Sequence, residues 1–205
     1  MKLYFSPGAC SLAPHIALRE AGLDFEPVKV DIKSKKTANG EDYLQINSKG
    51  YVPALRLDDG KLLTEVPAVL QYIADRKPET RLAPPNGTFD RYRLQEWLGF
   101  TSSEIHKSFS PLFRPDASDD VKNFARANLA KRLTWLEQNF GKGPYLMGQQ
   151  FTVADAYLFT VTGWGRFTGI DMAPYPTIAA YQKRVLERPA VRAALDYEKA
   201  QNAKA

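Results

Sequence analysis

The chain has few of the residues from which metal sites and disulfide frameworks are built. Among 205 residues there are one cysteine and two histidines. A single cysteine excludes an intramolecular disulfide and a cysteine-rich zinc site, so we predict no metal. No run of about 18 apolar residues exists, which argues against a membrane partner. The 14 prolines and 13 glycines are scattered, which excludes a collagen-like or low-complexity chain. We expect a soluble protein of a reducing compartment, the cytoplasm.

The composition is otherwise that of a folded protein with a sizeable core. Apolar residues make up 44% of the chain and aromatic residues 12%. The net charge is +5, but it is unevenly distributed: residues 1–75 hold 9 Lys and Arg against 10 Asp and Glu, whereas residues 76–205 hold 19 against 13. The basic residues alternate with acidic ones, as on solvated helix faces, and form no dense cluster. We therefore predict that nucleic acid is not a partner.

Residues 1–77 alternate between short apolar strands and helices. Pro7-Gly8 ends the first strand, and a helix over 11–21 ends at Gly22, so the first two strands form a parallel βαβ unit. Asp59-Gly60 predicts a hairpin between the third and fourth strands. Thr64 is the expected N-cap of a helix that runs to Ile73. This order predicts a small mixed four-stranded sheet with helices, its strands at 3–5, 27–32, 52–57 and 61–63.

Everything after the Pro-rich linker at 78–87 has a helical pattern. We predict an all-helical domain over 88–205, with helices near 88–108, 119–140, 153–168, 176–187 and 190–201. Thr152 and Asp155 have the spacing of a capping box before an apolar run. We interpret both as structural residues at a buried helix start, rather than Asp155 as a catalytic acid.

Several segments, in this order and spacing, resemble the bacterial beta class of the cytosolic glutathione transferases. The similarity extends over essentially the whole chain and rests on the segments 6–12, 51–55, 63–65, 104–107 and 151–159. It implies an α/β thioredoxin-like domain at 1–77 that binds glutathione as co-substrate. It also implies that the helical domain at 88–205 holds an electrophile site and dimer contacts, so we expect a homodimer.

Cys10 follows the first strand, at the predicted N-terminus of the first helix. The unpaired N–H groups and the dipole of a helix N-terminus favour a thiolate there, whereas a lone cysteine is also often an inert core residue. The resemblance favours the reactive alternative. It implies that Cys10 is catalytic, lies beside the glutathione sulfur, and either stabilises the glutathione thiolate or exchanges with it through a mixed disulfide.

The resemblance also assigns the other contacts that the thioredoxin-like domain makes with glutathione. Glu65 would bind the γ-glutamyl ammonium, and the backbone N–H of Val66 the adjacent carboxylate. Val52, before a cis Pro53, would pair its backbone with the cysteinyl residue of the ligand as an added strand would. Lys35 would hold the glycyl carboxylate. Without the resemblance, each of these residues has a simpler interpretation. Glu65 could be a favourable charge in the first turn of a helix, and Pro53 could be a trans proline at the start of a strand. Lys35 could belong to a solvated loop.

The helical domain is expected to add Ser103, Glu104, the backbone near Ile105, and a catalytic His106, some of them from the partner subunit. On residue type alone, both His106 and His15 are structural candidates. Aromatic residues proposed for the electrophile wall are Phe109, Phe113, Trp164 and Phe167. The sequence departs from the beta class at Val66, where that class has glycine, and at Gly99, where it has asparagine.

The predicted function is conjugation of the glutathione thiolate to small hydrophobic electrophiles, with thiol–disulfide activity linked to Cys10. Two alternatives remain open at this point. The protein could chiefly be a glutathione-dependent disulfide reductase, peroxidase or dehalogenation helper. It could also be a non-catalytic adapter of the same fold, although Cys10, Lys35, Glu65 and His106 are all present and argue for chemistry.

Overall fold

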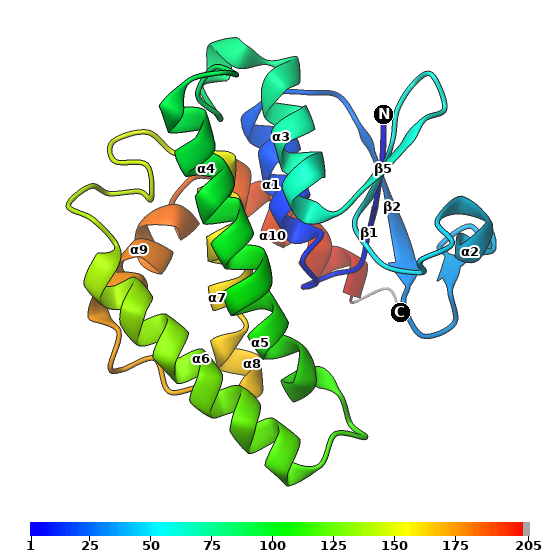
Figure 1. Cartoon of the computed structure of the whole chain (residues 1–205). Helices are drawn as coiled ribbons and strands as arrows, with labels where there is room; N and C mark the ends of the chain where they lie inside the picture. The colour runs from blue at the N-terminus through cyan, green and yellow to red at the C-terminus, as the bar shows by residue number, and fades with distance from the viewer. Residues whose placement is uncertain (203–205) are drawn as a thin grey trace. The chain divides into compact units, whose positions relative to one another are not determined.

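The computed structural model describes residues 1–202 (Figure 1). The chain forms two compact units. The first unit contains Met1–Ala83 and the C-terminal segment that begins at Arg188, and the second contains Pro84–Glu187. Residues 203–205, with which the predicted helical domain ends, lie outside the described part.

The first unit is built on a five-stranded mixed sheet. Its strand order is β3-β2-β1-β4-β5, with β1 and β2 parallel and the other neighbours antiparallel. The parallel pair and the Asp59-Gly60 hairpin agree with the sequence predictions. The predicted count of four strands is wrong, because β3 has only two residues and its alternation is too short to detect. The strands are β1 (Lys2–Phe5), β2 (Glu26–Asp31), β3 (Lys36–Thr37), β4 (Ala54–Arg56) and β5 (Leu62–Thr64).

The helices of this unit begin and end close to the predicted positions. Leu23 donates its backbone N–H to the carbonyl of Leu18, and Gly22 has a φ of +61°, which closes α1 as a left-handed cap. The prediction that Thr64 caps the next helix is wrong: Thr64 ends β5, and Glu65 occupies the N-cap position. The elements are α1 (Leu12–Glu20), α2 (Tyr43–Ile46), α3 (Val66–Arg76) and η1 (Pro78–Thr80).

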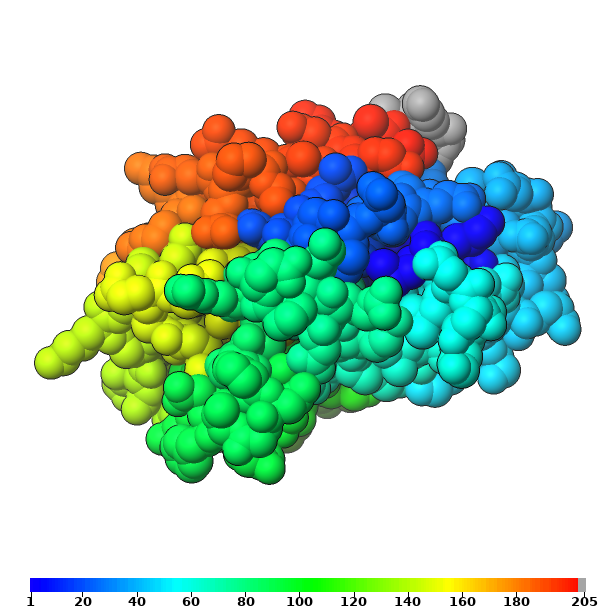
Figure 2. Space-filling view, turned by 90° about the horizontal axis from the view of Figure 1, so that it is seen from above, coloured from blue at the N-terminus to red at the C-terminus, as the bar shows by residue number. Residues whose placement is uncertain are grey.

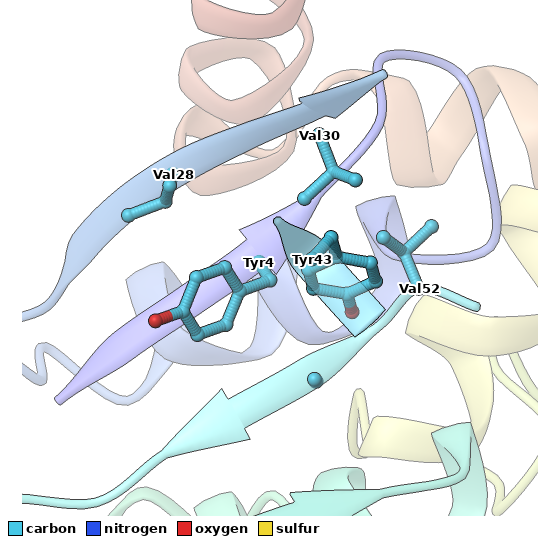
Figure 3. Close-up of a cluster of buried hydrophobic side chains, with 6 residues drawn as sticks. Tyr4, Val28, Val30, Tyr43 and Val52 are labelled. Atoms are coloured by element: carbon cyan, nitrogen blue, oxygen red, sulfur yellow. The ribbon is translucent and has the colours of Figure 1, made fainter. Parts of the chain in front are cut away.

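A cluster of buried side chains covers one face of this sheet (Figure 3). Tyr4, Val28 and Val30 project from β1 and β2, and Tyr43 of α2 packs against Tyr4 with ring centroids 5.7 Å apart. Val52 joins the same cluster. Because successive strand residues point to opposite faces, Phe5 lies on the other face and packs against His15 of α1. The core therefore fixes the segment before β4 that carries Val52.

Helix α10 (Pro189–Asn202) packs with the first unit, although the sequence places it after all the other helices. Arg188 forms two hydrogen bonds with the Glu20 carboxylate, of 2.6 and 2.8 Å. Buried Glu198 bonds to His15, and Lys29 donates to the carbonyl of Gln201. The space-filling view shows the C-terminal segment in red beside N-terminal residues in blue (Figure 2). The predicted domain 88–205 is thus not a single packing unit, because α10 packs against α1 and these polar pairs join the C-terminal segment to α1 and β2.

The second unit is helical, and α7 forms its centre because all ten of its residues are buried. The predicted helix over 88–108 is interrupted by a π-helical segment, and the predicted helix over 153–168 divides after Thr162. Among the described residues no helix is long and apolar enough to cross a membrane. The elements are α4 (Phe89–Phe100), the π-helical η2 (Thr101–His106), α5 (Lys107–Phe109), η3 (Ser110–Phe113), α6 (Asp119–Asn139), α7 (Val153–Thr162), α8 (Gly165–Thr168) and α9 (Pro176–Leu186).

Candidate functional site

Cys10 lies in the turn between β1 and α1, two residues before the helix begins. Its Sγ is 3.3 Å from the carbonyl oxygen of Val52, to which the thiol donates. The residue is half-buried. The structure therefore brings together two of the predicted site residues that are 42 positions apart in the sequence.

The thiol of Cys10 is protonated in this environment. Burial raises its pKa from 9.0 to about 12; the backbone N–H groups of Cys10 and Ser11 oppose this rise, and the negative charge of Glu65 adds to it. Of the two alternatives that residue type leaves open for Cys10, the raised pKa favours a protonated thiol over a thiolate in the unliganded protein. Desolvation of the charged form outweighs the two amides.

Glu65 connects β5 to α3 in an unusual backbone conformation. Its φ is +69°, in a region that residues with a side chain rarely adopt. Backbone strain of this kind is concentrated at ligand-binding positions. Its carboxylate is exposed and lies 2.6 Å from Nζ of Lys49. Val66 begins the helix, so its N–H is among those that the first turn leaves without an intrahelical acceptor.

Lys35 is the second predicted site residue with a positive φ, of +57°. Its Nζ donates to the carbonyl of Gly50 at 2.9 Å and lies 5.9 Å from the ring centroid of Tyr51. The turn that carries Gly50 and Tyr51 is held from below by the Tyr43 hydroxyl, which donates to the Tyr51 carbonyl at 2.7 Å. Lys35 is therefore fixed beside the segment that leads to Val52.

The Val52–Pro53 peptide bond is cis. Strand β4 begins immediately after it, with Ala54 paired to Tyr4 of β1. The segment over 50–53 thus presents backbone groups next to Cys10 before the chain joins the sheet.

His106 ends the π-helical segment in the second unit. Its Nδ1 is 2.7 Å from the hydroxyl oxygen of buried Tyr157. Its ring lies edge-on to Trp164, with centroids 4.9 Å apart. A phenol hydroxyl is the stronger donor towards a neutral imidazole nitrogen, so we assign the Tyr157 proton to this bond and the ring hydrogen of His106 to Nε2.

The other three predicted residues of the second unit also lie in the π-helical segment. Ser103 is exposed and donates to the carbonyl of Gly99, Glu104 forms an ion pair with Arg132, and Ile105 is buried. Hydrogen bonds between residues five apart make this turn wider than an α-helical one. Such π-helical turns are frequent at functional sites.

Of the four aromatic residues proposed for the electrophile wall, Phe109 and Phe113 pack against Trp164. The ring centroid of Trp164 is 5.8 Å from Phe109 and 5.3 Å from Phe113. Phe113 is 49% exposed, so this cluster reaches the surface. Phe167 is 65% exposed and lies under the guanidinium of Arg166 instead.

Thr152 and Asp155 form the capping box that the sequence predicts. The Thr152 N–H donates to the Asp155 carboxylate at 2.8 Å, and the other carboxylate oxygen accepts from the Leu146 N–H at 2.9 Å. Asp155 is completely buried, and burial raises its pKa from 3.8 to about 6 in spite of these bonds. Over residues 1–202, no group of three or more His, Cys, Asp or Glu side chains could hold a metal ion.

Comparisons with known proteins identify the family. A model described as "Glutathione S-transferase, N-terminal domain" matches residues 1–75, and one described as "Glutathione S-transferase, C-terminal domain" matches residues 100–189. A glutathione S-transferase of Escherichia coli O157:H7, GstA, is 48% identical over 97% of this chain and 98% of its own length. The chain belongs to the glutathione S-transferase family.

Solved structures of this family agree with the bacterial beta-class resemblance. A beta-class glutathione S-transferase from Sphingomonas chungbukensis is 51% identical, with a TM-score of 0.94 over 97% of this chain and 98% of its own. A sphingomonad glutathione S-transferase solved with glutathione is 52% identical, with the same TM-score over 97% and 99%. These likenesses confirm the predicted fold class, a thioredoxin-like unit followed by a helical domain.

One residue beside the site was missed by the sequence analysis. Lys49 was not considered, although its ammonium bonds to the Glu65 carboxylate. The sequence offered one indication of a role for Lys49, which is its position two residues before the segment 51–55 on which the family resemblance rests. At the two positions that depart from the beta class, Val66 is buried, and a Cβ at Gly99 would meet nothing within 4 Å, so packing does not require a glycine at position 99.

Proposed function

We propose that this chain is a glutathione transferase that joins the glutathione thiolate to small hydrophobic electrophiles. The observation that carries the proposal is the convergence of three groups in the first unit. The Cys10 thiol donates to the Val52 carbonyl, and Glu65 is near enough to influence the pKa of that thiol. These groups match those of glutathione one by one. The Cys10 thiol can contact the thiol of the ligand, the extended backbone at Val52 can pair with its peptide backbone, and the Glu65 carboxylate can bind its ammonium group.

In the proposed complex, each part of glutathione meets one of these groups. The γ-glutamyl ammonium binds Glu65, and its carboxylate accepts from the Val66 N–H. The cysteinyl backbone pairs with Val52, and Lys35 holds the glycyl carboxylate. The ligand also draws on Ser103, Glu104, the Ile105 backbone and His106, some of them from a partner subunit, as the family resemblance implies.

The proposed reaction is a substitution or addition by sulfur. Glutathione loses its thiol proton to solvent, and the sulfur electron pair forms a bond to an electrophilic carbon. In a substitution, the bond from carbon to the leaving group breaks, and the leaving group departs with its electron pair. In an addition, the π bond of the electrophile opens, and the atom that receives its electron pair takes a proton from solvent. Holding the thiolate near the bound electrophile supplies the proximity part of the rate enhancement.

The state of Cys10 favours conjugation over exchange as the main activity. A thiol with a pKa of about 12 is a hydrogen-bond donor at neutral pH and a poor nucleophile. When the cysteinyl N–H of the ligand takes the Val52 carbonyl, the Cys10 S–H can donate to the glutathione thiolate instead. We propose mixed-disulfide formation at Cys10 as a secondary activity.

We further propose a homodimer that acts in the cytoplasm. Large aromatic side chains on the second unit support an interface: Phe89 and Tyr92 of α4 are 72% and 60% exposed, and Phe124 of α6 is 77% exposed. Analytical ultracentrifugation of the wild type should give the mass of a dimer. The double variant Tyr92→Ser, Phe124→Ser should dissociate to the monomer more readily. Cell fractionation checks the compartment.

The function is tested by comparing two reactions of the purified protein with glutathione. We expect turnover of an aryl halide by the wild type, and a slower reaction with a mixed disulfide. Cys10→Ala should remove the disulfide reaction and reduce, without abolishing, conjugation. A protein that is not retained on immobilised glutathione and turns over neither substrate would favour the adapter alternative.

A further inference from the structure

In the unliganded protein Lys49 forms an ion pair with the Glu65 carboxylate, the group to which the proposed function assigns the amine of the ligand. Its Nζ lies 2.6 Å from Oε1 of Glu65 and 3.1 Å from Oγ1 of Thr64. We propose that Lys49 is an internal competitor for Glu65, so that it sets the affinity of the protein for ligands with a primary ammonium group. This inference rests on the proposed binding of the γ-glutamyl ammonium by Glu65.

The competing ammonium is presented by a well-anchored turn. The Lys49 backbone N–H donates to Oδ1 of buried Asn47 at 3.2 Å, and the Gly50 N–H donates to the Asn47 carbonyl at 2.8 Å. The Asn47 side chain also donates to the Tyr51 carbonyl at 2.8 Å. Because the turn is fixed at three points, the lysine side chain starts from a constant position beside Glu65.

The exposure of the pair makes it displaceable. The side chains of Lys49 and Glu65 are 49% and 67% exposed, so both charges remain in contact with solvent. Ion pairs of this kind contribute little to folding. The Lys49 ammonium can therefore leave Glu65 without loss of the fold, and its role is separable from stability.

The Glu65 carboxylate can accept more than one hydrogen bond, so a ligand ammonium could bind either oxygen beside Lys49. On either oxygen, however, two positive charges would stand within a few ångströms of each other and repel. In both cases the Lys49–Glu65 ion pair of the free protein weakens the electrostatic attraction between Glu65 and the ligand ammonium. Removing the Lys49 charge should tighten amine binding about two- to fivefold, which is the range that exposed ion pairs give.

The test is titration calorimetry with two ligands. One is glutathione, and the other is glutathione without its γ-glutamyl amine. Lys49→Met should bind glutathione about two- to fivefold more tightly than the wild type and should gain nothing for the deaminated ligand. Lys49→Arg retains the charge and should resemble the wild type. Lys61→Met is the matched control, because Lys61 forms a similar exposed pair with Asp59 at 2.8 Å.

The outcomes separate this inference from the proposed function. If the wild type binds glutathione and Lys49→Met binds it equally or more weakly, the competitor role is overturned, and weaker binding would make Lys49 a contact for a ligand carboxylate. If the gain appears for both ligands, it does not arise from the amine, and the inference also fails. If the folded wild type, checked by its thermal transition, binds neither ligand, the proposed function falls and this inference falls with it.

Discussion

The backbone N–H of Gly8 donates to the carboxylate of Glu198 at 2.9 Å, across 190 positions of the sequence. Gly8 lies two residues before Cys10, and Glu198 lies on α10. The second oxygen of Glu198 is 3.0 Å from Nδ1 of His15, whose Nε2 accepts from Nε of Arg19 at 3.0 Å. That acceptor role assigns a ring hydrogen to Nδ1, so His15 links Glu198 to Arg19. The expectation that His15 is structural agrees with this arrangement.

Loss of the Glu198 carboxylate should destabilise the protein and loosen the turn that carries Cys10. Glu198→Ala leaves the Gly8 N–H and the His15 ring hydrogen without their acceptor in a site that is 3% exposed. We expect the free energy of unfolding to fall by about 2–4 kcal/mol, measured by denaturant titration. Asp196→Ala, at an exposed position of the same helix, should change it by less than about 0.5 kcal/mol. Equal stability of the two variants would contradict this account of Glu198.

The Cys10 thiol should react slowly with alkylating reagents at neutral pH. With its pKa raised by burial to about 12, it is far less ionised at pH 8 than an ordinary thiol. We expect alkylation of the folded protein, followed by mass spectrometry, to be more than about tenfold slower than that of the unfolded chain. Rapid modification of the folded protein at pH 7 would show that the thiol is activated instead.

The same shift has a consequence for stability, with a defined sign. Between pH 9 and 12 the unfolded thiol loses its proton while the folded thiol keeps it, so the folded state binds more protons. The contribution of Cys10 to stability is complete below pH 9 and is lost as the pH rises towards 12. Cys10→Ala should therefore lose less stability than the wild type over this interval.

Asp155 should show the corresponding behaviour at acid pH. Burial raises its pKa to about 6, so its protonated form favours the folded state, and this contribution is lost as the pH rises from about 4 through 6. Asp155→Asn does not titrate at this position. The stability of the wild type relative to Asp155→Asn should therefore increase between pH 7 and pH 5, as measured by thermal or denaturant unfolding. A relative decrease would contradict the raised pKa.

Tyr157 should act as a positioning residue for His106. Tyr157→Phe retains the buried ring but removes the hydroxyl 2.7 Å from Nδ1, so the imidazole loses the bond that fixes its tautomer. We expect kcat for conjugation to fall about tenfold and its pH profile to shift, because the hydrogen bond that we propose from His106 to the glutathione thiolate would no longer be held in one orientation. Tyr181→Phe removes another buried hydroxyl, which donates to the Asp155 carbonyl, and should leave the pH profile unchanged. Identical profiles for the wild type and Tyr157→Phe would exclude the positioning role.

Local sequence patterns predicted much of the fold because they depend on neighbouring residues. Gly22 after a helix, Asp59-Gly60 between strands, and the Thr152–Asp155 spacing each act within a few positions, and each has the expected structure. The pairing of α10 with α1 was not predictable in this way. It depends on single polar groups such as Glu198 and His15, which no periodicity connects.

The site was harder to predict than the fold. The resemblance supplied the candidate residues, but the protonated state of Cys10 follows from burial, which the sequence does not reveal. The π-helical turn that carries Ser103 and His106 likewise has no signal in a pattern that fits an ordinary helix. Lys49 was overlooked because one exposed lysine in a loop is indistinguishable from its neighbours until Glu65 is placed beside it.

The most direct test of the central claim is a crystal structure of the protein with glutathione. The account predicts the ligand ammonium at the Glu65 carboxylate, the cysteinyl backbone paired with Val52, and the ligand sulfur in contact with Sγ of Cys10. A fully occupied ligand bound elsewhere, with its sulfur distant from Cys10 and its amine away from Glu65, would contradict it.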